Sequence, residues 1–253
     1  SLHSIYSLDA FEKNKTSLWA EKFSLRPYHS LIGVSNCVIN DYLQWVPFKG
    51  RTFVLYNFLP DIYFQQKHKR NDKTDGLRCI AVGNLKQLKN YGFLLEAFKR
   101  LKGENISLDI YGTGELMESL QSDIAAFSLP VRLCGTSDDT SITLPEYDLF
   151  IQASLHEGYG LAVMEAMAMG LPVMLSDIPA FREITNGSAH FFSLDSVTPF
   201  IEKIIELKRC PSARYKFITT SIEIAEKNAS KDSYLNNLRR IYSEVAGAKY
   251  QFG

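Results

Sequence analysis

The sequence lacks an excess of charge of either sign, because 28 Lys and Arg residues balance 28 Asp and Glu residues. Binding nucleic acid through its phosphates requires a surplus of Lys and Arg, so the balance of charges argues against a nucleic-acid partner. Glycine (15) and proline (9) are too few for a collagen-like or low-complexity chain, while 45% hydrophobic residues can form a core. The 253 residues suit one large domain, or one domain with part of another.

Cysteine is scarce, and long hydrophobic runs are missing. Cys37, Cys79, Cys134 and Cys210 are spaced too widely for a CxxC zinc or redox pair, so free thiols in a reducing compartment are expected. No apolar run reaches the roughly 18 residues of a membrane-spanning helix. The first residues also lack the charged-then-apolar order of a signal peptide. These absences predict a cytoplasmic protein.

A regular alternation begins at residue 77, where short apolar runs are separated by amphipathic stretches of helical length. This order predicts βαβ units and a parallel sheet covered on both faces. The predicted fold class is therefore α/β, with a doubly wound, Rossmann-like domain over residues 77–210 and helices over residues 211–253. The expected strands are 78–83, 107–112, 130–134, 148–152, 172–176 and 189–192, and the expected helices between them are 91–101, 115–127 and 160–169.

Residues 1–60 follow another pattern. It predicts a helix over 8–23, a strand over 30–34, a helix over 36–45 and a strand over 52–56. Two strands do not make a stable open sheet, so this segment is interpreted as the partial tail of a second α/β domain. Residues 61–76 are polar, carry a basic run at 67–70, and are predicted to be a linker.

Small residues follow several predicted strands, at the edge of a parallel sheet where ligands bind. Glycine there allows a ligand to approach the backbone closely. Gly112-x-Gly114 alone is a weak signal, because the third glycine of a dinucleotide-binding motif would fall at Met117. The candidate positions at these strand ends are Gly83, Asn84, Gly112, Gly114 and Gly135.

The strongest local signal contains two glutamates with seven residues between them. Glu157 follows a predicted strand, and a glycine-rich turn leads into a helix near Gly160, whose free amides suit a phosphate. Glu165 lies in an otherwise apolar helix and needs a partner, because burying it alone would be costly. A carboxylate can accept two hydroxyl groups, which suits a ribose diol. In the alternative reading, Glu165 caps a backbone turn and Glu157 is a solvated loop residue.

This segment resembles the E-x7-E signature of retaining glycosyltransferases with the GT-B architecture, above all the large family 4. The resemblance implies a GT-B fold, of which this chain holds the C-terminal donor domain and the tail of the N-terminal acceptor domain. It continues through further motifs in the family's order, at residues 81–85, 89–90, 108–114, 147–154, 170–173 and 181–183, and reaches back to 32–35 and 54–57.

The resemblance also implies site roles for a donor of the UDP-, GDP- or ADP-sugar class. Lys89 would neutralise the diphosphate, Glu165 would hold the ribose, and Glu157 would bind the transferred sugar, which makes Glu157 and Lys89 the candidate catalytic residues. Glu165→Gln is expected to weaken nucleotide binding, whereas Glu157→Gln is expected to leave it near wild type. No metal or other cofactor is implied. The remaining implied donor-binding residues are Gly83, Asn84, Gly112, Gly114, Gly135, Gly158, Tyr159, Gly160 and Leu161.

The implied reaction is sugar transfer to a glycan or lipid-linked acceptor in bacterial surface polysaccharide synthesis, with contact at the inner face of the membrane as a secondary expectation. The sequence departs from the family at Asn84, where many members carry Arg. It also departs in length, since a complete N-terminal domain needs more than ~100 further residues. The alternatives are a non-catalytic nucleotide-sugar-binding fragment and a GT-B sugar-nucleotide epimerase. The E-x7-E spacing favours transfer.

Overall fold

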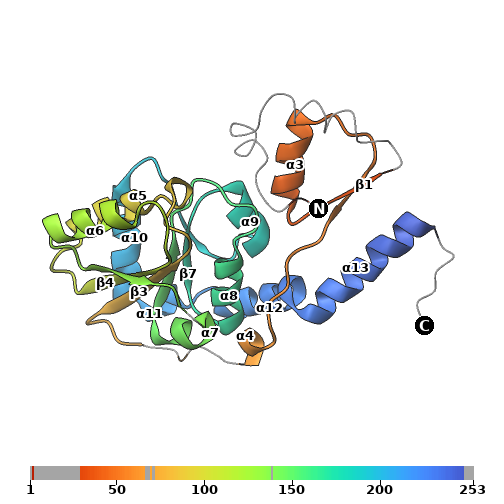
Figure 1. Cartoon of the computed structure of the whole chain (residues 1–253). Helices are drawn as coiled ribbons and strands as arrows, with labels where there is room; N and C mark the ends of the chain where they lie inside the picture. Colours follow the sequence, from red (N-terminus) through yellow and green to blue (C-terminus); the bar gives the residue numbers. More distant parts are fainter. Residues whose placement is uncertain (1, 3–28, 66–68, 70–71, 138, 248–253) are drawn as a thin grey trace.

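The computed structural model describes residues 2, 29–65, 69, 72–137 and 139–247. Its main body is a six-stranded parallel sheet between two layers of helices (Figure 1). This architecture confirms the predicted doubly wound α/β fold, and a strand forms at each of the six predicted places. The strands are β3 (Leu77–Val82), β4 (Ile106–Tyr111), β5 (Val131–Gly135), β6 (Leu149–Gln152), β7 (Val173–Ser176) and β8 (His190–Phe192).

The strand order is β5-β4-β3-β6-β7-β8. Strands β4 and β5 are added on one side of β3 and strands β6 to β8 on the other, so the strand order reverses between β3 and β6. These two strands pair through Cys79 with Leu149 and Ile80 with Phe150. The connections that leave them run to opposite sides, which opens a crevice beyond their carboxyl ends. β6 and β7 are buried at every position, as expected of central parallel strands covered on both faces.

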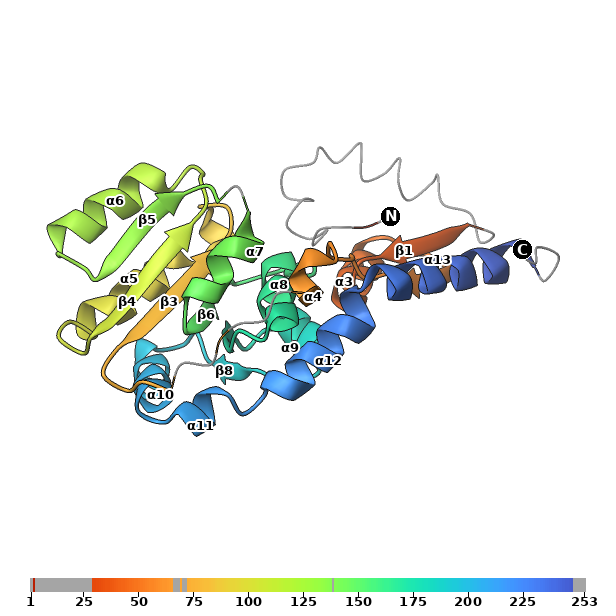
Figure 2. The same ribbon diagram turned by 90° about the horizontal axis from the view of Figure 1, so that it is seen from below.

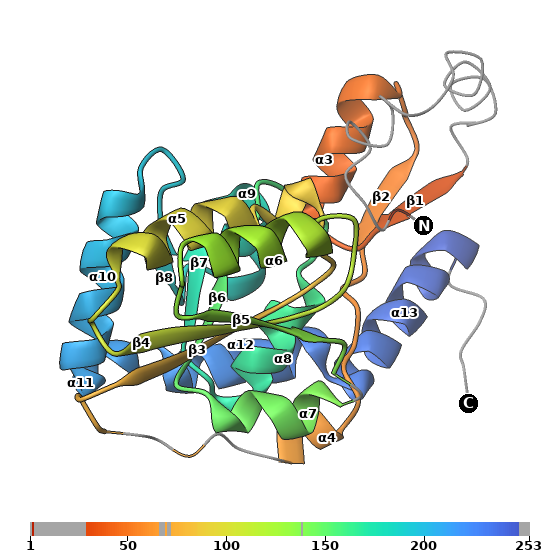
Figure 3. The same cartoon turned by 60° about the vertical axis from the view of Figure 1, so that its left-hand side comes forward.

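The helices form two layers with separate apolar cores (Figure 3). On one face lie α5 (Tyr91–Arg100), α6 (Met117–Ala126) and α10 (Val197–Arg209). On the other face lie α8 (Leu161–Met169), α9 (Pro179–Thr185) and α12 (Ile218–Ala229). Helix α8 is buried along most of its length, because its sequence is almost entirely apolar. Helix α10 ends at Arg209, and the short α11 (Pro211–Arg214) begins with proline.

The N-terminal unit is a separate small layer. It contains the parallel strands β1 (Ser30–Gly33) and β2 (Arg51–Val54) and the helix α3 (Asn36–Trp45), which begins where Ser35 accepts a hydrogen bond from the Val38 amide. The last described helix, α13 (Lys231–Ala246), returns to this unit, and its Ile241 packs with Phe53 and Leu55 (Figure 2). The helix predicted over 8–23 lies outside the described residues.

The segment predicted as a linker contains a short helix, α4 (Ile62–Gln65). Tyr63 of this helix is only 8% exposed and packs in the core beside α8. Most of the basic run at 67–70 lies outside the described residues. Within the described part of the chain, no helix combines the length and the apolar character needed to cross a bilayer. All four cysteines are free, and Cys79 is buried.

Candidate functional site

A pocket of about 410 Å³ opens beyond the carboxyl ends of β3 and β6, where the strand order reverses. Ligands of doubly wound sheets bind at this position. The pocket brings together residues from four stretches of the sequence: the end of β3 and the loop after it, Thr140 after β5, the end of β6 and the loop after it, and the first turns of α8. Of the residues predicted from the sequence, it is lined by Gly83, Asn84, Lys89, Glu157, Gly160, Leu161 and Glu165.

Lys89 and Glu157 form an ion pair across this pocket. Lys89 ends the short 3₁₀ helix η1 (Gln87–Lys89), and its Nζ donates to Glu157 Oε1 at 2.5 Å. The two side chains are 23% and 12% exposed. The same carboxylate oxygen accepts a hydrogen bond from Ser154 Oγ at 2.7 Å. Glu157 is therefore a held, partly buried carboxylate and not a solvated loop residue.

The support for Glu157 continues into the end of β6. Gln152 Nε2 donates to Ser154 Oγ at 2.9 Å, and Ser154 Oγ donates in turn to Glu157. Both Gln152 and Ser154 are buried. Neither residue was among the site residues predicted from the sequence, although two polar residues at the end of an otherwise apolar strand were a signal. Among the described residues, Gln152 Oε1 has no hydrogen-bond partner.

Glu165 lies on α8 at the opposite side of the same pocket. Its Oε2 accepts a hydrogen bond at 2.9 Å from the hydroxyl of Thr140, the first residue of α7 (Thr140–Thr143). The Tyr63 hydroxyl lies 2.6 Å from Thr140 Oγ1. Burial raises the pKa of Glu165, and the nearby hydroxyls of Thr140 and Tyr63 oppose that rise. The partner of Glu165 is thus a side-chain hydroxyl and not a backbone turn.

Helix α8 begins without a side-chain cap. Gly160 occupies the N-cap position with φ of 82°, and no side chain accepts its first amides. A Cβ at this position would also lie 3.0 Å from the ring of Phe181, so both the conformation and the space favour glycine. Leu161 and Ala162 line the pocket, which places the first turn of the helix against it. Uncapped amides and the positive end of the helix dipole favour an anion here.

The other predicted glycines have different surroundings. A Cβ on Gly112 would lie 1.9 Å from the Gly83 carbonyl oxygen, and one on Gly114 would lie 2.7 Å from the Leu85 carbonyl oxygen. These glycines therefore allow the loops after β3 and β4 to lie backbone to backbone. Gly135 joins them through its carbonyl, which accepts from the Gly112 amide at 2.7 Å. None of the three predicted glycines lines the pocket, so their contact with the donor stays a prediction.

Gly158 and Tyr159 face the N-terminal unit. The Gly158 carbonyl accepts from Ser35 Oγ at 2.6 Å, and the buried Tyr159 ring stacks on Tyr56 with 5.4 Å between centroids. Glu183 on α9 adds a further contact, because its carboxylate accepts from the amides of Asn36 and Cys37 at 2.7 and 2.9 Å. The loop that carries Glu157 is thereby held against α3.

A second pocket, of about 370 Å³, lies on the far side of Glu157. Helix α3 contributes Cys37, Asn40, Asp41 and Gln44 to it, and the main domain contributes Glu157 and neighbours on α9. Glu157 therefore lines both pockets. This arrangement places one carboxylate between the crevice of the sheet and the N-terminal unit.

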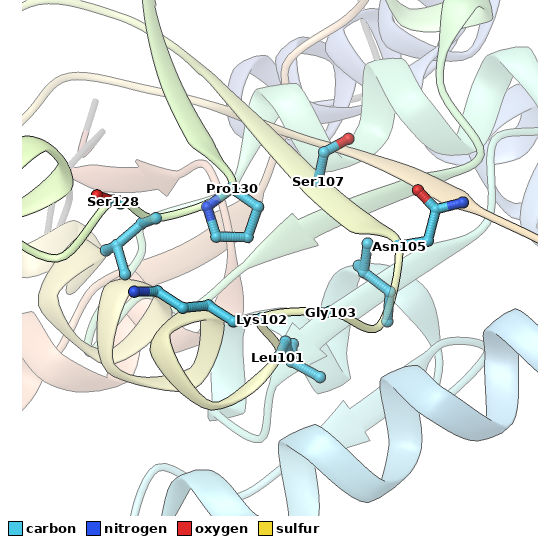
Figure 4. Close-up of a pocket in the computed structure, with 9 residues that line it drawn as sticks. Leu101, Lys102, Gly103, Asn105, Ser107, Ser128 and Pro130 are labelled. Atoms are coloured by element: carbon cyan, nitrogen blue, oxygen red, sulfur yellow. The ribbon is translucent and has the colours of Figure 1, made fainter.

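A third pocket of about 560 Å³ lies at the amino-terminal ends of the strands, near the starts of β4 and β5 (Figure 4). Among the described residues of its lining, Lys102 is the one that carries a charge, and none of them was predicted for the site. Its position away from the strand carboxyl ends makes it a poor candidate despite its size. Among the residues that the structure describes, no group of three His, Cys, Asp or Glu could hold a metal ion.

Comparison with known proteins identifies relatives of this chain in sequence. The chain is 28% identical over 174 residues to a poly(glycerol-phosphate) alpha-glucosyltransferase of Bacillus subtilis, which covers 66% of the chain and 26% of that protein. It is 24% identical over 212 residues to the O-antigen biosynthesis glycosyltransferase WclY of Escherichia coli, with coverage of 79% and 60%. The chain thus spans between a quarter and three-fifths of the length of these curated relatives.

The crystal structure of Anabaena Alr3699/HepE in complex with UDP and glucose superposes with a TM-score of 0.79 at 17% identity, over 97% of this chain and 70% of that one. This likeness confirms the predicted GT-B type of fold. The family model described as "Glycosyl transferases group 1" matches residues 76–209, more than half of the chain. The chain therefore belongs to the group 1 family of glycosyl transferases.

Proposed function

We propose that this chain carries the donor-binding half of a retaining, metal-independent glycosyltransferase. The enzyme moves a sugar from a nucleotide diphosphate to a glycan or lipid-linked acceptor in bacterial surface polysaccharide synthesis, on the cytoplasmic side. One observation carries the proposal: Lys89, the uncapped start of α8 and the two glutamates of the E-x7-E segment converge on one pocket at the reversal of the strand order.

The diphosphate binds between Lys89 and the first turn of α8. Both groups line the pocket, and both present positive charge or N–H donors to it. As the bond to the sugar breaks, negative charge grows on the departing diphosphate. A lysine and fixed backbone amides stabilise that charge without a metal ion, and such electrostatic stabilisation commonly lowers the reaction barrier more than any other single effect.

The two glutamates divide the donor between them. Glu165 accepts hydrogen bonds from the ribose hydroxyls, since it lies on α8 beside the first turn that holds the phosphates. Glu157 binds hydroxyls of the transferred sugar, since it lines both the first and the second pocket. The acceptor then approaches from the second pocket, where Asn40 and Gln44 offer amide groups that suit a hydroxyl-rich molecule.

The relatives support this assignment. The Anabaena protein of similar fold is described in complex with UDP and glucose, and the Bacillus relative is named as an alpha-glucosyltransferase of poly(glycerol phosphate). A second candidate function is nucleotide-sugar binding without turnover. The observation that favours it is the share of each relative that the chain spans, 26% and 60% of their length.

Isothermal titration calorimetry in EDTA tests the proposal, with UDP, GDP and ADP compared with their monophosphates. We expect one diphosphate to bind at least about tenfold tighter than its monophosphate, because Lys89 and α8 address the second phosphate. Lys89→Ala should remove most of that difference. Equal affinity for the two forms, or binding that requires Mg²⁺, would contradict the proposal. Release of sugar from the cognate donor separates transfer from binding alone.

A further inference from the structure

Glu165 is held by two residues that come from different parts of the chain. Thr140 is supplied by α7, and Tyr63 by α4, within the segment that joins the N-terminal unit to the main domain. Their hydroxyl oxygens are 2.6 Å apart, and Thr140 donates to Glu165 Oε2 at 2.9 Å. Tyr63 is buried, so its hydroxyl is held in place by core packing.

The direction of this hydrogen-bond chain follows from the chemistry of its members. An ionised carboxylate only accepts, so the single hydroxyl hydrogen of Thr140 goes to Glu165. The Thr140 oxygen is then an acceptor, and Tyr63 donates to it. Each donor strengthens the next, and the chain fixes the position of one carboxylate oxygen.

We propose that Tyr63 and Thr140 are positioning residues that orient the Glu165 carboxylate for the ribose hydroxyls of the donor nucleotide. The joining helix α4 thereby contributes to donor affinity although none of its residues lines the donor pocket. The inference rests on the proposed function, because it assigns supporting residues to the same nucleotide site.

The environment of Glu165 explains why such support is needed. The neighbouring helical residues Met164 and Ala166 are fully buried, and burial raises the pKa of the carboxyl. The nearby hydroxyls of Thr140 and Tyr63 lower it again, while the like charge of Asp139 at the start of α7 raises it further. Lys89 and Glu157 face the same pocket from its other side. Removing either hydroxyl therefore disfavours the charged, hydroxyl-accepting form of Glu165.

The test measures nucleotide affinity as a function of pH with the full chain. The probe is UDP. GDP or ADP replaces it if the wild type binds that nucleotide more tightly than UDP. Thr140→Val and Tyr63→Phe remove one hydroxyl each with little change in shape, and Thr140→Ser keeps the hydroxyl. Thr185→Val is the matched control, because Thr185 is buried and donates at 2.7 Å to the Phe181 carbonyl, away from Glu165.

We expect Thr140→Val to weaken binding by about tenfold, the usual scale for a lost hydrogen bond to a charged group. Tyr63→Phe should weaken binding by a smaller factor, because its hydroxyl donates to the neutral Thr140 hydroxyl. The loss of binding on acidification should also begin at higher pH in both variants, because the Glu165 carboxyl protonates more readily. Thr140→Ser and Thr185→Val should follow the wild-type pH profile.

Three outcomes would overturn the inference. Wild-type affinity and pH profile in both variants would leave the proposed function standing and remove the positioning role. An equal loss at every pH, matched by Thr185→Val, would show that the hydroxyls only stabilise the fold. Failure of the wild type to bind any of the three diphosphates would overturn the proposed function and the inference together.

Discussion

The ion pair between Lys89 and Glu157 predicts that Glu157→Gln binds free UDP more tightly than the wild type. The Lys89 ammonium lies 2.5 Å from Glu157 Oε1, and an incoming diphosphate must share that ammonium with the carboxylate. Glutamine keeps the shape and can still accept from Ser154, but it removes the competing negative charge. The lysine is then free to bind the diphosphate.

The size of the gain follows from the burial of the pair. Fully exposed ion pairs contribute about 0.2–1 kcal/mol, and hydrogen bonds to charged groups about 1.5–3 kcal/mol. With side chains 23% and 12% exposed, this pair lies between those limits. A gain of about 1.5 kcal/mol corresponds to roughly tenfold tighter UDP binding. UDP-sugar should gain less than UDP, because the variant weakens the contact of Glu157 with the sugar.

Calorimetry on a double-mutant cycle measures this effect. Lys89→Met should weaken UDP binding, and Lys89→Met/Glu157→Gln should recover part of the loss, because Glu157 no longer stands unpaired beside the diphosphate. Glu206→Gln is the matched control, since it removes the exposed pair with Lys203 on α10, away from the pocket. Unchanged UDP affinity in Glu157→Gln, with additive effects in the double variant, would refute the competition between the two acceptors of Lys89.

Three further predictions concern groups around the site. Glu165→Gln should unfold at higher denaturant concentration than the wild type at pH 7 but not at pH 4. Burial raises the pKa of Glu165 in the folded state, so its charged carboxylate destabilises the fold at pH values above the pKa that it has in the unfolded chain. An equal difference in stability between variant and wild type at both pH values would contradict this. Glu183→Ala should cost about 2 kcal/mol of stability and speed amide exchange in α3, because it removes the acceptor of the Asn36 and Cys37 amides; unchanged exchange would refute the contact. Gly112→Ala should cost more than about 3 kcal/mol of folding stability through its clash with Gly83. Gly187→Ala has open space around the new Cβ and should cost about 1–2 kcal/mol, from its left-handed backbone alone. Denaturant titration measures both, and equal losses of stability would contradict the close loop packing.

The sheet was predictable because its signals are local. Each central strand is a short apolar run bounded by polar or small residues, and α8 is apolar from Leu161 to Met169 except at Glu165. A single carboxylate in such a helix indicates a partner whatever the rest of the fold. The sequence therefore located the strands, the helices and the E-x7-E segment without knowledge of the strand order.

The pairing within the site was not predictable, because it depends on which strands become neighbours. Lys89 and Glu157 are 68 positions apart, and Tyr63 and Thr140 are 77 apart. The sequence assigned Lys89 and Glu157 to separate parts of the donor, and hence expected Glu157→Gln to leave nucleotide affinity unchanged. The observed contact between them changes that expectation to a gain in affinity.

The glycines show a second limit. A glycine at a strand end indicates that something approaches the backbone closely, but it does not say what. At Gly112 and Gly114 the approaching group is the neighbouring loop. Tyr159 is comparable, since its place between two glycines of the motif said nothing about the direction of its ring, which stacks on Tyr56.

A crystal structure of the chain with a bound nucleoside diphosphate tests the central claim most directly. We predict the diphosphate between Lys89 and the first turn of α8, with the ribose hydroxyls at Glu165 and the sugar side open toward Glu157. A nucleotide bound at the amino-terminal ends of the strands, in the pocket around Lys102, would contradict this claim. So would a nucleotide in the crevice with its ribose at Glu157 and its phosphates away from α8.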